Sequence, residues 1–139
     1  MRGHRQLFFW LILILFMATG CQPIQTIKDK QTIVDLEKTL NAYENTLRWG
    51  RIENIFAFLD PEIFTQTSVP EGLDNIRVSQ YFVVNRPALL DENRATQSVK
   101  ISYVLEDRQV EHSFIDNQQW GRKEGTELWY RTNPIPEFK

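Results

Sequence analysis

Apolar residues between Asp29 and Trp49 recur at spacings of three and four, a pattern typical of one face of an α-helix. That face is made up of Ile33, Leu36, Leu40, Tyr43 and Leu47. Gly50 follows the last apolar position and suits the end of a helix. Because the spacing lasts for about two heptads, fewer than a coiled coil needs, it predicts a helix that packs on a sheet.

A shorter helix is predicted over residues 51–59, where most apolar positions are close together. Asp60 and Pro61 then have the residue types favoured at the cap and at the first position of a further helical turn. Residues 65–75 include Pro70 and Gly72 and are predicted to form a loop.

The rest of the chain alternates between apolar and polar residues, as half-buried strands do. Arg86 and Pro87 are expected to interrupt the first strand, and Asn133–Pro136 to end the sheet, because proline cannot continue a ladder of hydrogen bonds. Strands are predicted at residues 76–84, 88–90, 95–105, 110–120 and 126–131, with a hairpin loop at 121–125.

Ala95, Val99, Ile101, Tyr103 and Leu105 share one face of the third of these strands. Val110, His112 and Phe114 are expected to face inward from the next. Helices followed by an antiparallel meander indicate an α+β fold. We predict a long N-terminal amphipathic helix and a short helix, packed on a curved antiparallel sheet of about four to five strands, in a single domain over residues 29–139.

The start of the chain has a different pattern. Residues 7–18 carry no charge and follow Arg2 and Arg5. As a helix they would span about 18 Å, which is too short to cross a bilayer. A basic start, a short apolar run and then small residues are typical of a secretory signal peptide. The alternatives are an uncleaved membrane anchor and a plain signal peptide followed by a cysteine.

The run ends in Ala18, Thr19, Gly20 and Cys21, which resembles the lipobox of bacterial lipoproteins. The resemblance implies that residues 1–20 are a signal peptide, cut between Gly20 and Cys21, and that Cys21 is acylated. Residues 21–28 would be the acylated cysteine and a short tether. Several acyl chains on one residue make a stable anchor, whereas one chain holds only marginally. Acylation also accounts for a lone cysteine in an exported protein.

In lipoprotein sorting, Gln22 after the cysteine points away from retention in the inner membrane. The resemblance therefore implies an anchor in the outer membrane, with the domain facing the periplasm. The expected partners are the lipid bilayer, through acylated Cys21, and an envelope protein or a small apolar ligand.

Three segments resemble the nuclear transport factor 2-like superfamily, which includes polyketide-cyclase-like and ketosteroid-isomerase-like domains. They are Leu47-Arg48-Trp49-Gly50, residues 55–61 and Glu106-Asp107-Arg108. The resemblance covers most of residues 29–132 and implies a cone of helix and sheet with a pocket at its open end. Some relatives are enzymes and many are binding modules, so the fold alone does not assign a function. The cystatin fold, also one helix on an antiparallel sheet, is the alternative.

His112 is the only histidine after the signal segment. The resemblance implies that a cavity of such a domain holds general acids and bases, and imidazole suits that chemistry near neutral pH. Asp116 lies further along the same face, and Tyr103 lies on the neighbouring strand. The three residues are candidates for a catalytic set, and the alternative is a histidine with a structural role. The aromatic residues Trp49, Trp120, Trp129, Phe82 and Tyr130 would either line an apolar pocket or belong to the core or the sheet surface.

Composition narrows the function further. The chain has 16 Lys and Arg against 18 Asp and Glu, and its basic residues are scattered, which argues against nucleic-acid binding. We expect no metal and no cofactor, because the sequence has no cluster of ligands and no glycine-rich phosphate loop.

The leading hypothesis is a non-catalytic binding or accessory module of the cell envelope. The alternative is a small cavity enzyme, an isomerase or dehydratase, that uses His112. A third hypothesis is a structural accessory whose edge strand adds to a partner sheet.

Overall fold

The computed structural model describes residues 23–139, with side chains from residue 28 onward. The expected signal peptide and the acylation of Cys21 lie outside the described residues. The elements of the described chain are α2 (Pro23–Trp49), the 3-10 helix η1 (Ile52–Phe58), α3 (Pro61–Gln66), the 3-10 helix η2 (Leu73–Asn75), and the strands β1 (Ile76–Asp91), β2 (Arg94–Leu105), β3 (Val110–Arg122) and β4 (Trp129–Arg131). The predicted α+β class is confirmed.

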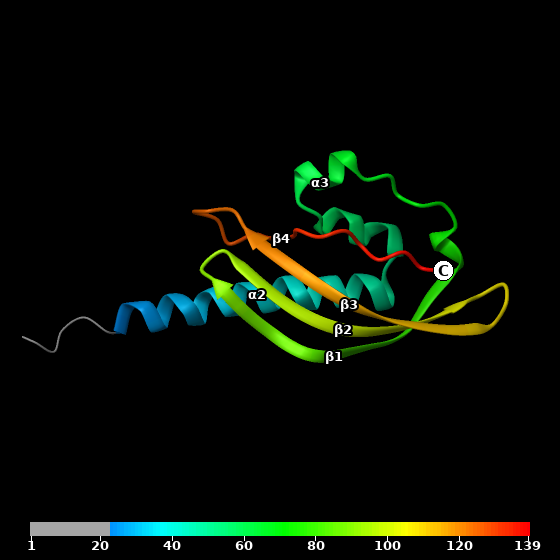
Figure 1. The fold of residues 1–139 in the computed structure, drawn as a ribbon, viewed down its shortest axis with the longest axis horizontal. Coiled ribbons are helices and arrows are strands. Elements are labelled where there is room, and N and C mark those ends of the chain that lie inside the picture. The colour runs from blue at the N-terminus through cyan, green and yellow to red at the C-terminus, as the bar shows by residue number, and fades with distance from the viewer. Residues whose placement is uncertain (1–22) are drawn as a thin grey trace, which may run out of the picture. The chain divides into compact units, whose positions relative to one another are not determined.

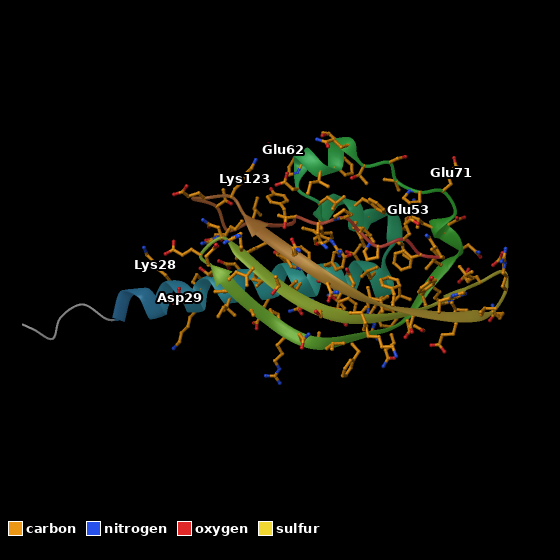
Figure 2. The ribbon with its side chains drawn as sticks, viewed as in Figure 1. Lys28, Asp29, Glu53, Glu62, Glu71 and Lys123 are labelled. Carbon is orange, nitrogen blue, oxygen red and sulfur yellow. The ribbon has the colours of Figure 1, made fainter. Side chains whose placement is uncertain are left out.

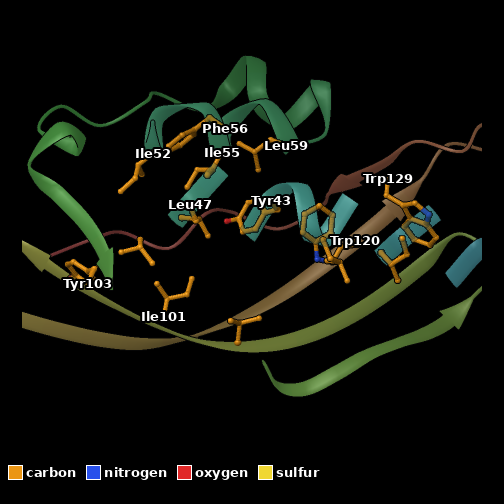
Figure 3. Close-up of a cluster of buried hydrophobic side chains, with 14 of the residues drawn as sticks. Tyr43, Leu47, Ile52, Ile55, Phe56, Leu59, Ile101, Tyr103, Trp120 and Trp129 are labelled. Atoms are coloured by element: carbon orange, nitrogen blue, oxygen red, sulfur yellow. The ribbon is translucent and has the colours of Figure 1, made fainter. Parts of the chain in front are cut away.

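The strands form one antiparallel sheet in the order β1-β2-β3-β4. Figure 1 shows β1, β2 and β3 as long, bent neighbours, so the sheet is curved as expected. Residues Gln31–Lys139 make one compact unit that contains the whole sheet. Within this unit, side chains of α2 and η1 share one buried cluster with those of β2 and β3 (Figure 3).

The predicted buried face of α2 is confirmed at four positions, Leu36, Leu40, Tyr43 and Leu47. It is wrong at Ile33, which is 40% exposed, while Thr32 and Asp35 are buried instead. On a helix, the residues three and four positions before Leu36 both lie near its face. In the structure the residue four positions back is the buried one. Asp35 is satisfied there by Gln31 at 3.1 Å and by Lys38 at 3.0 Å.

The end of α2 is confirmed at Gly50, whose N–H donates to the carbonyl of Thr46 at 3.0 Å. A side chain at Gly50 would place its Cβ 2.8 Å from that same oxygen, so glycine is required here by close approach. The helix as described begins at Pro23, inside the segment that we expected to be a tether.

The second helical segment is also confirmed. Asp60 caps α3 by accepting a hydrogen bond from the N–H of Glu62 at 2.9 Å, and Pro61 is the first residue of that helix. Residues 65–75 are less regular, but the predicted loop also contains the short helix η2. The N–H of Asp60 donates to the carbonyl of Arg131 at 2.9 Å, which ties this region to β4.

The prediction that Arg86 and Pro87 interrupt the first strand is wrong. β1 continues through them as a strand of 16 residues, with register shifts on both sides of Asn85. β1 lies at the edge of the sheet. Proline is tolerated at an edge or a bulge because the missing N–H has no partner strand to pair with.

Burial on β2 agrees with the prediction for Ala95, Val99, Ile101 and Tyr103, while Leu105 is half-buried. On β3 the inward face is shallow at its start, since Val110 is 47% exposed and His112 and Phe114 are half-buried. Burial becomes complete only toward Trp120, because the first residues of β3 pair with the end of β2 beside the β2–β3 turn. The predicted closing strand is shorter than expected and covers Trp129–Arg131.

Candidate functional site

Two of the three candidate catalytic residues lie together. Tyr103 and His112 are directly opposed on β2 and β3, and their rings stack with centroids 5.3 Å apart at 19°. Tyr103 is buried and His112 is half-buried. The Tyr103 hydroxyl accepts from the N–H of Lys139 at 2.8 Å and donates to the carbonyl of the same residue. This hydroxyl is therefore already engaged by the C-terminal segment.

Asp116 lies apart from this pair. It is four residues beyond His112 on the same strand, a separation of about 13 Å at the usual strand rise. Its carboxylate accepts two hydrogen bonds from Arg131, at 2.6 and 2.8 Å. Both side chains are at most 1% exposed. Gln118 donates a third bond to Asp116 at 2.9 Å. The carboxylate is thus held in an ion pair with Arg131, and none of its hydrogen bonds described here involves His112.

Arg131 uses its remaining donors on other groups. It donates to the hydroxyl of Tyr43 at 2.9 Å and to the carbonyls of Asn133 and Pro134 at 3.1 and 2.9 Å. Burial acts to lower the pKa of Arg131, but Asp116 and Tyr43 outweigh it, so the pKa is raised and the charge is retained. A buried arginine with this many partners has its desolvation compensated.

The polar network continues across the sheet. Gln97 donates to the hydroxyl of Tyr81 at 3.0 Å and to Gln118 at 3.1 Å, and Trp120 donates to Gln118 at 3.2 Å. Burial raises the pKa of both Tyr43 and Tyr81. Sequence reasoning missed the glutamines and Arg131. Strand alternation could have found Gln97 and Gln118, since Gln97 lies between the inward residues Ala95 and Val99, and Gln118 precedes the inward residue Trp120 by two positions.

The aromatic candidates divide into three groups by burial. Trp120 and Trp129 belong to the core, while Trp49 and Phe82 are 76% and 57% exposed. Tyr130 is half-buried.

An apolar hollow of about 380 Å³, here called the terminal pocket, lies at the end of the sheet. It is lined by Phe56 of η1, by the loop of residues 67–73, by Ile76 and Leu105 at the strand ends, and by residues 135–138. Phe138 also packs edge-on against Tyr103, with ring centroids 5.1 Å apart. The terminal pocket therefore lies next to the Tyr103–His112 pair, although His112 does not line it.

The rim of the terminal pocket is polar and acidic. Thr67, Ser68, Glu71 and Glu137 contribute to its lining. Figure 2 shows Glu71 extending from the loop between α3 and η2, and Glu137 pairs with Lys139 at 2.9 Å. An apolar wall with a few polar groups is the usual composition of a small-molecule pocket, and its volume lies within the usual range of about 300–1,000 Å³.

Among residues 23–139, no three His, Cys, Asp or Glu side chains come close enough to hold a metal ion. In the same range, no helix has the length and apolar content that crossing a membrane requires. No protein-family model, no curated protein and no solved structure matches the chain.

Proposed function

We propose that the chain is a bacterial lipoprotein, anchored through acylated Cys21 in the outer membrane and facing the periplasm, whose domain is a non-catalytic binding module. The observation that supports the anchor is the uncharged run of residues 7–18 that ends at Ala18-Thr19-Gly20-Cys21. The thiol of Cys21 has no other use in the sequence, because a disulfide within the chain would need a second cysteine.

We propose further that the domain has the nuclear transport factor 2-like fold. Two features support this assignment. The helix packs its buried side chains in one cluster with those of a curved antiparallel sheet, and a pocket lies at one end of that sheet. The cystatin-like alternative has the same helix and sheet. The terminal pocket favours the first assignment, since a pocket at the open end is what that resemblance implies.

The ligand proposed for the terminal pocket is a small apolar molecule. The single observation that supports it is the apolar part of the lining of this hollow of about 380 Å³, to which Phe56, Leu105 and Phe138 contribute from three separate parts of the chain. Apolar area removed from water on binding contributes roughly 25 cal/mol per Å². The acidic rim disfavours a ligand that carries negative charge near the opening.

The enzyme alternative has less support. His112 would need a partner to orient it or to share its proton. Asp116 is held by Arg131, and the Tyr103 hydroxyl is held by Lys139. The partner-sheet hypothesis is also weaker, because bulges and Pro87 break the ladder along the free edge of β1.

The anchor is tested by Cys21→Ser and Gln22→Asp in a diderm host supplied with labelled fatty acid. The wild type should take up label and fractionate with the outer membrane. Cys21→Ser should lose both the label and the membrane association, and Gln22→Asp should move the labelled protein to the inner membrane. A wild type without label, or a Cys21→Ser variant that still pellets with membranes, overturns the anchor.

The ligand is tested by purifying the full chain from membranes and identifying bound small molecules by mass spectrometry. Leu105→Trp places a larger side chain in the terminal pocket, and Ile115→Trp makes the same change at a position of β3 that is 51% exposed. We expect an apolar molecule in the wild type and in Ile115→Trp, and its depletion in Leu105→Trp. Equal recovery from all three proteins contradicts the binding proposal.

A further inference from the structure

A second hollow, here called the helix pocket, lies between α2 and the first two strands and has a volume of about 270 Å³. Glu37 and Glu44 border it from α2, Tyr81 and Arg86 from β1, and Gln97 from β2. None of these five residues lines the terminal pocket. The helix pocket is therefore a separate site, to which neither the anchor nor the apolar ligand assigns a role.

Gln97 lines the helix pocket and carries an acceptor without a partner among the described residues. Gln97 is 4% exposed, and its amide nitrogen is used on Tyr81 and Gln118. Its oxygen Oε1 accepts no hydrogen bond from any residue that the structure describes. In the described part of the chain, the buried side-chain atoms without a partner are Arg122 Nε and Trp129 Nε1. Gln97 Oε1 is therefore open to the pocket that Gln97 lines.

The lining of the helix pocket also offers a donor. The Tyr81 hydroxyl accepts from Gln97 at 3.0 Å and from Gln118 at 3.3 Å, but it donates to no group within residues 28–139. Burial raises the pKa of Tyr81, so the phenol keeps its proton at neutral pH. A ligand in the helix pocket thus meets one free O–H donor and one free carbonyl acceptor.

Charges of both signs surround the opening. Glu37 and Glu44 are seven residues apart on α2, so they share one side of the helix about 10 Å apart. Glu44 pairs with Arg48 at 3.1 Å, whereas Glu37 forms no ion pair with a described residue. Arg86 lines the same pocket from β1 and is likewise unpaired among the described side chains. A ligand with only one sign of charge would be repelled from one side of this opening.

The apolar part of the lining is formed by Leu40, Val83 and Pro87. The volume of the helix pocket is below the range of about 300–1,000 Å³ that holds drug-sized ligands. A fitting ligand is therefore small, carries both an ammonium and a carboxylate group, and has an apolar side group.

We propose that the helix pocket binds a small zwitterion, an apolar amino acid or a dipeptide of such residues. Glu37 receives the ammonium group, Arg86 receives the carboxylate, and the side group packs on Leu40, Val83 and Pro87. The free O–H of Tyr81 donates a hydrogen bond to the ligand, and the free Oε1 of Gln97 accepts one.

The test is titration calorimetry of the full chain in detergent micelles with L-leucine and leucyl-leucine. Leucinamide lacks the carboxylate and N-acetylleucine lacks the ammonium group, so they report on each half of the site separately. Arg86→Gln should weaken binding of leucine or leucyl-leucine by about tenfold and leave leucinamide unaffected. Glu37→Gln should weaken the same zwitterion by a similar factor and leave N-acetylleucine unaffected.

Arg77→Gln is the matched control, since Arg77 lies on β1 outside the helix pocket. Glu37 and Arg86 are exposed and unpaired within the described chain, so their variants should keep the thermal midpoint of the wild type. The proposal is overturned if neither zwitterion shows saturable binding up to about 10 mM, a concentration that corresponds to a binding free energy of only a few kcal/mol. An effect of Arg77→Gln equal to that of Arg86→Gln also overturns it.

Discussion

Arg131 and Asp116 form a two-pronged ion pair in the interior of the domain, with nitrogen–oxygen distances of 2.6 and 2.8 Å. The pair joins β4 to β3, and Arg131 continues it to Tyr43 on α2. Sheet, helix and the C-terminal segment therefore meet at one guanidinium group. The arrangement also explains why Asp116 does not lie with His112.

Asp116→Asn should destabilise the domain by about 3–5 kcal/mol, because it leaves the buried charge of Arg131 without its counter-ion. Urea unfolding measures the loss. The double variant Asp116→Asn with Arg131→Met should recover part of it, since removing both charges removes the uncompensated desolvation. Asp91→Asn breaks the exposed pair with Arg94 and serves as the control, with no measurable change expected. A single variant no less stable than this control would disprove the stabilising role of the pair.

Leu36→Ala should lower the unfolding free energy by about 2–5 kcal/mol, because Leu36 is fully packed in the cluster under α2. Ile33→Ala, three residues earlier on the same helix, should stay within about 0.5 kcal/mol of the wild type, since Ile33 is exposed. Chemical denaturation of the two variants compares the predicted face with the observed one. Equal losses of unfolding free energy in the two variants would support the face predicted from the sequence and contradict the observed packing.

Tyr103→Phe removes the hydroxyl that receives the N–H of Lys139 and should cost about 0.5–1.5 kcal/mol. Amide hydrogen exchange of Lys139 should become faster, while the amides in the middle of β2 keep their protection. Tyr130→Phe, at a half-buried tyrosine outside this contact, is the reference. Unchanged exchange at Lys139 would contradict the role of the Tyr103 hydroxyl in holding the last residue.

Stability should fall at alkaline pH. Burial raises the pKa of Tyr43 and of Tyr81 from 10.0, the model-compound value. Folding therefore favours the protonated phenols: their contribution is fully present below about pH 10 and is lost as the pH rises toward the folded pKa. The expected slope above pH 10 is about 1.4 kcal/mol per pH unit for each tyrosine.

Urea unfolding between pH 8 and 11 measures this slope. Tyr81→Phe should reduce the slope of stability against pH by the contribution of one tyrosine. Trp49→Phe, a change at an exposed aromatic residue that does not titrate, should leave it unchanged. A slope that is the same in Tyr81→Phe and in the wild type would contradict the link between burial and alkaline unfolding.

Residue types were enough to predict the helix end at Gly50 and the cap at Asp60, and periodicity was enough to predict the inward face of β2. Periodicity failed at Ile33 because a spacing of three and a spacing of four before Leu36 both fit a helix face. Packing against the sheet decides which of the two residues is buried. The prediction at Pro87 failed because a proline is excluded from central strands only, and strand order is not encoded locally.

The candidate site was predicted in part. Pairing of neighbouring strands allowed Tyr103 and His112 to be placed together. The partner of Asp116 was not predictable in the same way, since Arg131 reaches it from a three-residue strand whose register depends on the tertiary fold. The terminal pocket brings together Phe56, Leu105 and Phe138, which only folding makes neighbours.

The irregular edge of β1 has a consequence for how copies of this chain meet at high concentration. A straight, unpaired edge of this length would offer a template on which copies of the same chain could stack into fibrils. The register shifts and Pro87 divide that edge into short stretches, none long enough to nucleate such growth. Replacing Pro87 by a residue with a free N–H should therefore promote self-assembly of the domain more than it lowers the stability of the fold.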